Sequence, residues 1–297
     1  MTPQSSEPPL GGSRAHIKSI FPSLVPSEQR VAQLCIDSPE TVARMSVADL
    51  VAETGTSPAT IVRACKGLGF AGFQHLRQVL LRDLGAAARD SAEQDSLAAR
   101  GEPGSSEHLV SGIFSRAAQD IRGALGSLDF TAFDGAAAAI RRARRLLIVA
   151  NGASLSPAKS LALRFLAAGV VCEAPGDIAT QHISAKLLRP GDVCIAVSDS
   201  GMNSFTLGSA RLAADSGATV IGVTSYAKSA LAEVSTHTLM AGAEFHAWND
   251  ELPIGNIVQM LILSALHAAV TGNSPEVVEA RSAVFEEVLH SIVEDNQ

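Results

Sequence analysis

The spacing of apolar residues in the first part of the chain predicts short helices. Ser27 can cap a helix in which Val31, Leu34 and Cys35 share one face. The run Asp-Ser-Pro at 37–39 cannot continue that face and ends the helix. This part of the chain therefore favours a small all-helical unit.

Two further helices follow, joined by the Thr-Gly-Thr turn at 54–56. Ser46 and Asp49 have the spacing of a capping box and predict the start of the first helix. Ser57 predicts the start of the second, because it is a good N-cap and Pro58 suits the first helical position. Two short helices joined by a tight turn are a candidate helix-turn-helix.

Small or basic side chains lie along the outer face expected for the second of these helices. Such groups approach phosphates and base edges when a helix enters the major groove of DNA. The candidate DNA-binding residues are Ser57, Ala59, Thr60, Arg63 and Lys66. An ordinary helical hairpin with a solvated face is the alternative interpretation.

Beyond residue 107 the pattern changes to alternating helices and short, continuously apolar runs. The runs at 146–150, 170–173, 193–197 and 219–224 predict strands buried on both faces of a parallel sheet. Helices are expected at 108–125, 130–142, 155–169, 180–188, 204–216 and 254–270. This alternation predicts a doubly wound α/β domain after the helical one.

Three of the predicted strands end in residues that carry hydroxyl or amide groups. Parallel strands end at one edge of the sheet, where open α/β folds bind ligands, so these groups are expected to gather there and hold an anion beside helix N-termini. The candidate effector-binding residues are Asn151, Gly152, Ser154, Ser198, Ser200, Gly201, Asn203, Thr224 and Ser225. The alternative is that they only cap the helices that follow.

Charge and composition narrow the possible partners. The chain has 297 residues, a net charge of −7 and only 4% aromatic residues, which disfavours an aromatic platform that stacks on nucleobases. Residues 14–85 hold eight Lys/Arg against six Asp/Glu and form the one net-positive block. A helix that binds in a DNA groove is therefore expected within residues 14–85.

The four cysteines and the N-terminus bear on compartment and cofactors. Cys35, Cys65, Cys172 and Cys194 are far apart and form no C-x-x-C pair, which favours reduced core thiols over disulfides or zinc. We expect no metal and no cofactor. Residues 1–13 are polar and rich in Pro and Gly, so we expect a disordered leader, no membrane segment and a cytoplasmic protein.

The segment MSVADLVAETGTSPATIVRACKGLGFAGFQHLR resembles the N-terminal domain of RpiR-type bacterial transcription regulators. The similarity includes the S-x-A-T-I-V-R recognition helix and the L-G-[FY]-x-G-[FY] exit, and it covers about residues 27–85. The resemblance implies that this domain binds operator DNA.

The second half, about 110–275, resembles the SIS (sugar isomerase) domain. The family's G-x-G-x-S matches residues 150–154, where Ala150 replaces a Gly, and its S-x-S-G-x-T matches 198–203, where Asn203 replaces a Thr. Its third loop matches Thr224 and Ser225. The resemblance implies a site for a phosphorylated small molecule, such as a phosphosugar.

These features together predict a transcription regulator and not an enzyme. The expected parts are the leader 1–13, a DNA-binding domain 14–85, a linker 86–107 and an effector domain 108–297 that assembles a homodimer or homotetramer. A phosphosugar isomerase and a ligand-free oligomerisation module remain alternatives. An isomerase needs a general base, for which His182, His246 and Glu251 are the candidates.

Overall fold

The computed structural model describes residues 10–94, 101–242 and 254–272, together with Pro8 and isolated positions beyond 278. It divides into two compact units. The first comprises Met1–Leu128, Ser225–Ser229 and Met240–Val258, and the second comprises Asp129–Thr224, Ala230–Leu239 and Gln259–Gln297. We describe each unit by itself.

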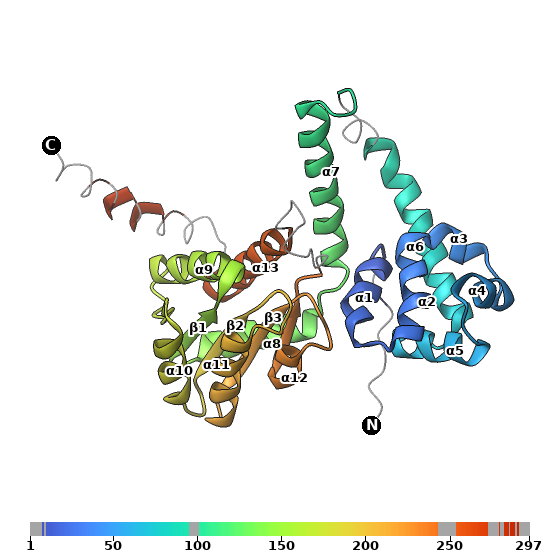
Figure 1. The fold of residues 1–297 in the computed structure, drawn as a ribbon. Helices are drawn as coiled ribbons and strands as arrows, with labels where there is room; N and C mark the ends of the chain where they lie inside the picture. The colour runs from blue at the N-terminus through green and yellow to red at the C-terminus, as the bar shows by residue number, and fades with distance from the viewer. Residues whose placement is uncertain are drawn as a thin grey trace. The chain divides into compact units, whose positions relative to one another are not determined.

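Helices make up the N-terminal part of the first unit (Figure 1). They are α1 (Ser13–Ile20), η1 (Phe21–Ser23), α2 (Pro26–Asp37), α3 (Pro39–Arg44), α4 (Val47–Thr54), α5 (Pro58–Gly67), α6 (Phe73–Gln94) and α7 (Ser106–Leu125). The helices expected from the sequence are α2, α4, α5 and α7. Helices α1, α3 and α6 were not expected.

Local chemistry explains where α4 and α5 begin and end. The capping box is present, since Ser46 Oγ accepts from the Asp49 N–H and the Asp49 carboxylate accepts from the Ser46 N–H. Gly55 ends α4 in the left-handed region at φ +59°, which only glycine adopts without strain. Pro26 occupies the first turn of α2, so the expected N-cap at Ser27 is wrong and Val25 takes that place.

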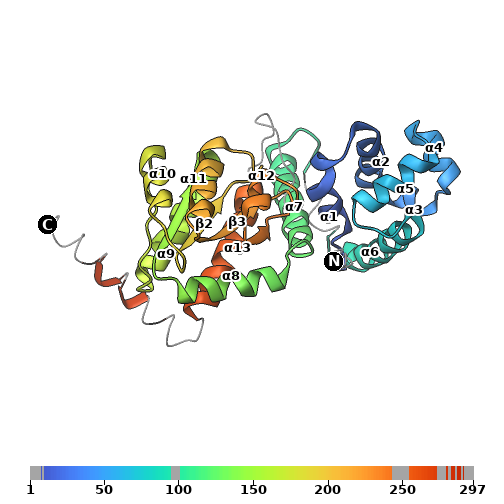
Figure 2. The same ribbon diagram turned by 90° about the horizontal axis from the view of Figure 1, so that it is seen from below.

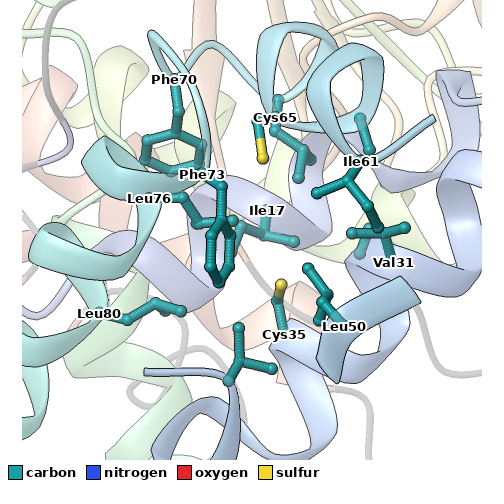
Figure 3. Close-up of a cluster of buried hydrophobic side chains, with 14 of the residues drawn as sticks. Ile17, Val31, Cys35, Leu50, Ile61, Cys65, Phe70, Phe73, Leu76 and Leu80 are labelled. Carbon is teal, nitrogen blue, oxygen red and sulfur yellow. The ribbon is translucent and has the colours of Figure 1, made fainter. Parts of the chain in front are cut away.

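A hydrophobic core joins α1 to α6 (Figure 3). Side chains from α1, α2, α4, α5 and α6 meet in it, and the labelled members are Ile17, Val31, Cys35, Leu50, Ile61, Cys65, Phe70, Phe73, Leu76 and Leu80. Ile61 and Cys65 of α5, and Leu68 directly after it, are fully buried and form the inner stripe of this helix. Burial of this stripe fixes which face of α5 points outward.

The second unit is a four-stranded sheet in the order β1-β2-β3-β4. The strands are β1 (Leu146–Ala150), β2 (Val193–Val197), β3 (Thr219–Thr224) and β4 (His237–Met240), and the pairs β1–β2 and β2–β3 are parallel. The helices are α8 (Phe130–Arg142), α9 (Leu155–Ala167), α10 (Ile178–Lys186), α11 (Ser204–Asp215), α12 (Ala230–Val234) and α13 (Ile254–Thr271), with the turn η2 (Gly152–Ser154) before α9.

Helices cover both faces of this sheet, as a doubly wound fold requires. Figures 1 and 2 show α10 and α11 on one face and α8, α9 and α13 on the other. Alternate residues of β1 and β2, together with Val220 of β3, pack against α10, α11 and α12; they are Leu147, Val149, Cys194 and Ala196. Every residue of β1 and β2 is buried, which explains their continuous apolar sequence.

The strand expected at 170–173 is wrong. Only Glu173 pairs with β1, where its N–H donates to Leu146 O and its C=O accepts from the Ile148 N–H, both at 2.8 Å. Val171 is 83% exposed, and Pro175 has no N–H to continue a ladder. The apolar run is therefore a surface segment with one bridge.

The four cysteines have free thiols, and three of them are core residues, as the sequence predicted. Cys35, Cys65 and Cys194 are buried, and Cys172 is partly buried. Burial raises the pKa of Cys35 and of Cys194 to about 12 and that of Cys65 to about 11, so their thiols stay protonated at neutral pH. Within the described ranges, no helix is both long and apolar enough to cross a bilayer.

Candidate functional sites

The outward face of α5 is the candidate DNA-reading surface. Ser57 caps the helix, since its Oγ accepts from the Thr60 N–H at 3.2 Å. Ser57, Ala59, Arg63 and Lys66 are exposed. Four of the five residues expected on this face therefore lie on it.

Thr60 is the exception, and its expected place on the outer face is wrong. Its side chain is 6% exposed, because Thr60 lies one turn before the buried Ala64. Its Oγ1 lies 2.9 Å from Ser57 Oγ and accepts from Arg63 Nη2 at 3.1 Å. Thr60 thus orients Arg63.

Arg63 is held from a second side by Glu28 of α2. The distance from Arg63 Nε to Glu28 Oε1 is 3.6 Å. The Arg63 side chain is nevertheless 61% exposed. An exposed ion pair contributes little to stability, so its main effect is to restrict where the guanidinium points.

Val62 also lies on this face, and our sequence reasoning missed it. Its side chain is 46% exposed. Helical spacing contained the signal, because residues 59, 62, 63 and 66 follow the i, i+3, i+4, i+7 pattern of one face.

The second candidate site lies at the carboxyl edge of the sheet. The first loop runs from Asn151 through η2 into α9, with Gly152 at φ +64°. Ser154 Oγ accepts from the backbone N–H of Asp199, in the loop after β2, at 3.3 Å. The Thr224 hydroxyl, at the end of β3, donates to Asp199 O at 3.0 Å. Asp199 therefore joins the three strand ends, which the sequence predicted would meet.

The loop after β2 is a tight turn that leads into α11. Gly201 donates its N–H to Ser198 O at 3.0 Å and has φ +62°, and Ser200 Oγ accepts from the Met202 N–H at 3.2 Å. Asn203 caps α11, since its Oδ1 accepts from the N–H groups of Phe205 and Thr206 at 3.2 and 3.1 Å. Capping is thus part of the role of this loop.

The hydroxyl groups of the site differ in how far they are buried. Ser154, Ser198, Thr224 and Ser225 are each less than 5% exposed, whereas Ser200 and Asn151 are partly exposed. Of these, Ser154 and Thr224 use their hydroxyl groups to bond the backbone of Asp199. Ser200 is the hydroxyl most open to a ligand.

Two buried glutamines support these loops, and the sequence analysis missed both. Gln181 of α10 is fully buried and accepts from Asn151 Nδ2 at 3.0 Å, while the same Nδ2 lies 3.0 Å from Thr206 Oγ1. Gln259 of α13 is also fully buried, and its Nε2 donates to Asp199 Oδ1 at 3.4 Å. A polar residue on the apolar face of a helix was the available signal.

The structure adds little support for a catalytic role of the three candidate bases. His182 Nε2 lies 3.3 Å from the carbonyl oxygen of Phe205, within the packing of α10 on α11. His246 and Glu251 lie outside the described residues. Among the residues that are described, no group of three His, Cys, Asp or Glu side chains is placed to hold a metal ion.

Comparison with known families identifies both halves of the chain. Residues 12–87 match the helix-turn-helix domain of the rpiR family, and residues 139–271 match the SIS domain. The chain belongs to the RpiR-type transcriptional regulators. In this RpiR-type regulator the candidate DNA-reading surface lies within the first matched region, and the strand-end loops lie within the second.

Relatives share this arrangement over most of their length. An uncharacterized HTH-type transcriptional regulator of Haemophilus influenzae is 23% identical over 88% of this chain and 90% of its own. The regulator HexR of Pseudomonas aeruginosa is 28% identical over 86% of this chain and 87% of its own.

Solved structures support the fold of the RpiR-type regulator. The NanR protein of Vibrio vulnificus, solved in complex with ManNAc-6P, covers 93% of this chain and 98% of its own at a TM-score of 0.54 and 21% identity. The sugar isomerase domain of an RpiR transcription factor from Sphaerobacter thermophilus covers 61% of this chain at a TM-score of 0.51 and 24% identity.

Proposed function

We propose that this regulator binds operator DNA through α5 and binds a phosphorylated small molecule, of the phosphosugar class, at the loops that follow β1, β2 and β3. The observation that carries the effector proposal is the bridge from Ser154 through Asp199 to Thr224. It brings three strand ends together beside the N-termini of α9 and α11, where the helix dipoles favour an anion. The complex of NanR with a sugar phosphate supports this choice of ligand.

The effector test starts from a ligand panel. Thermal shifts with N-acetylmannosamine 6-phosphate and other phosphosugars, against the unphosphorylated sugars, should show stabilisation by phosphorylated ligands only. Ser200→Ala should then weaken binding about ten- to a hundredfold, because a hydrogen bond to a charged group is worth roughly 1.5–3 kcal/mol. Ser160→Ala, on α9 outside the loops, is the matched control. Equal binding by both variants would contradict the proposal.

The DNA test uses an operator selected from random duplexes. Arg63→Ala should weaken its binding by about 1–3 kcal/mol if the guanidinium contacts a base. Arg211→Ala removes the same charge from an exposed position on α11 and should leave binding near the wild-type value. Wild-type affinity of the Arg63 variant would exclude α5 as the reader.

The two sites are proposed to be coupled. A ligand shifts a two-state equilibrium only through different affinities for the two states. Ser200→Ala and Ser154→Ala should therefore keep operator binding but lose part of the effector's influence on it. A wild-type response in both variants would mean that these loops only cap helices.

We infer that the regulator is at least a dimer that assembles through its α/β domain. Within that domain α9 exposes Leu163 and Leu166, and α13 exposes Met260 and Leu261, each more than 40% exposed. Two linked reading helices also gain affinity for a two-part site. Light scattering at micromolar concentration should show a dimer or tetramer, and a monomer that ignores DNA would contradict this.

We propose that the phosphosugar site senses its ligand and does not catalyse a reaction. We also propose that the protein is cytoplasmic, where operator DNA is accessible. His182 supports the sensing role because its Nε2 is engaged with a carbonyl oxygen between two helices. Incubation with sugar phosphates should leave them unchanged, and turnover would favour the isomerase alternative.

A further inference from the structure

The outward face of α5 carries one half-exposed apolar side chain, that of Val62. Val62 is 46% exposed, between Ala59 one turn earlier and Lys66 one turn later, and next to Arg63. A β-branched residue at an exposed helical position is less favourable than Lys or Glu. The exposed part of Val62 leaves apolar surface on the face of α5 that is proposed to meet DNA.

We propose that Val62 reads thymine, by contact of its methyl groups with the C5-methyl of one thymine per half-site. This inference rests on the proposed binding of operator DNA by α5. In the major groove thymine is the one standard base that presents a methyl group. A valine on the groove-facing side of a helix offers the matching apolar surface.

The neighbours of Val62 support a defined place for this contact. Arg63 is bonded to Thr60 Oγ1 and paired with Glu28, so the residue beside Val62 has a restricted direction. Ser57 and Pro58 fix the first turn of α5. Ile61 and Cys65 are fully buried on the opposite side, so α5 cannot rotate to hide Val62 without exposing its own core contacts.

The size of the effect follows from one methyl group. Burial of one methyl-sized group strengthens binding about fourfold. Removal of the thymine methyl should therefore weaken binding by about that factor, and only when Val62 is present to contact it.

Deoxyuridine differs from thymine only by the missing methyl group and provides the probe. In an operator selected from random duplexes, each thymine is replaced singly by deoxyuridine, and affinities are measured by fluorescence anisotropy at fixed salt. We expect one position per half-site at which the wild-type protein loses about fourfold in affinity. The Val62→Ala protein should bind thymine and deoxyuridine equally there.

Two controls separate this inference from its premises. Val110→Ala makes the same change at an exposed position of α7 and should keep the wild-type sensitivity to deoxyuridine. Arg63→Ala should bind more weakly but keep that sensitivity. Wild-type sensitivity in the Val62→Ala protein, or no sensitive thymine at all, overturns the inference alone. Absence of binding to every duplex overturns the proposed function as well.

Discussion

Gln181 provides a test of how the effector loops are held in place. Its Nε2 donates to Ala150 O and Pro175 O, each at 3.1 Å, and its Oε1 accepts from Asn151 at 3.0 Å. Gln181→Met keeps the volume and removes all three bonds. At about 1 kcal/mol per bond, the free energy of unfolding should fall by about 3 kcal/mol.

Urea unfolding of the full chain, followed by circular dichroism, measures this loss. Gln33→Met is the matched control, because Gln33 is exposed on α2 and bonds only to Asp37, and its effect should stay within about 0.5 kcal/mol. Gln181→Glu should be worse than Met at neutral pH, since it places a carboxylate against two carbonyl oxygens, and should recover partly as the pH falls. A loss below about 1 kcal/mol for Gln181→Met would refute this account of the loops.

Two further changes test other parts of the fold. Burial lowers the pKa of His16 below its ordinary value of 6.5, and the His16 Nε2 lies 2.8 Å from Leu68 O. The unfolded chain therefore binds a proton at His16 more readily than the folded chain does. The contribution of His16 to stability should be complete above pH 6.5 and should be lost as the pH drops through the pKa of the folded state. Thermal melts from pH 7.5 to pH 5 should show this fall in the wild type and less of it in His16→Gln, and parallel curves would contradict it. A side chain at Gly222 would overlap Ser235 Oγ, so Gly222→Ala should cost about 1–3 kcal/mol and Ser235→Ala in the same chain should restore part of it. No recovery in the double variant would show that another contact limits the space.

The sequence predicted the elements whose pattern is local. Ser46, Ser57 and Pro58 mark helix starts through their own side chains, and the helix at 130–142 and the strands at 146–150, 193–197 and 219–224 have the predicted bounds. The run at 170–173 has the same apolar character but lies at the edge of the sheet, where only Glu173 pairs. Strand pairing depends on neighbours that are distant in sequence, so composition alone could not separate these cases.

The candidate sites were predicted in outline but not in contact detail. The strand-end loops meet as expected, because parallel strands of one sheet end at one edge. Asp199, Gln181 and Gln259 were missed since each acts through bonds to loops at least 30 residues away or through its backbone. Thr60 was misplaced because its hydroxyl suggested solvent, whereas its position in the helix sets its burial.

The single bridge at Glu173 has a consequence for behaviour at high protein concentration. β1 is the edge strand of the sheet, and an open edge is a template on which another chain adds a strand. Glu173 occupies the middle of that edge, its carboxylate pairs with Arg145, and Pro175 follows two residues later. A foreign strand would have to displace this segment and break the ion pair before it could align with β1. This short segment therefore covers the edge of β1 and disfavours aggregation by strand addition.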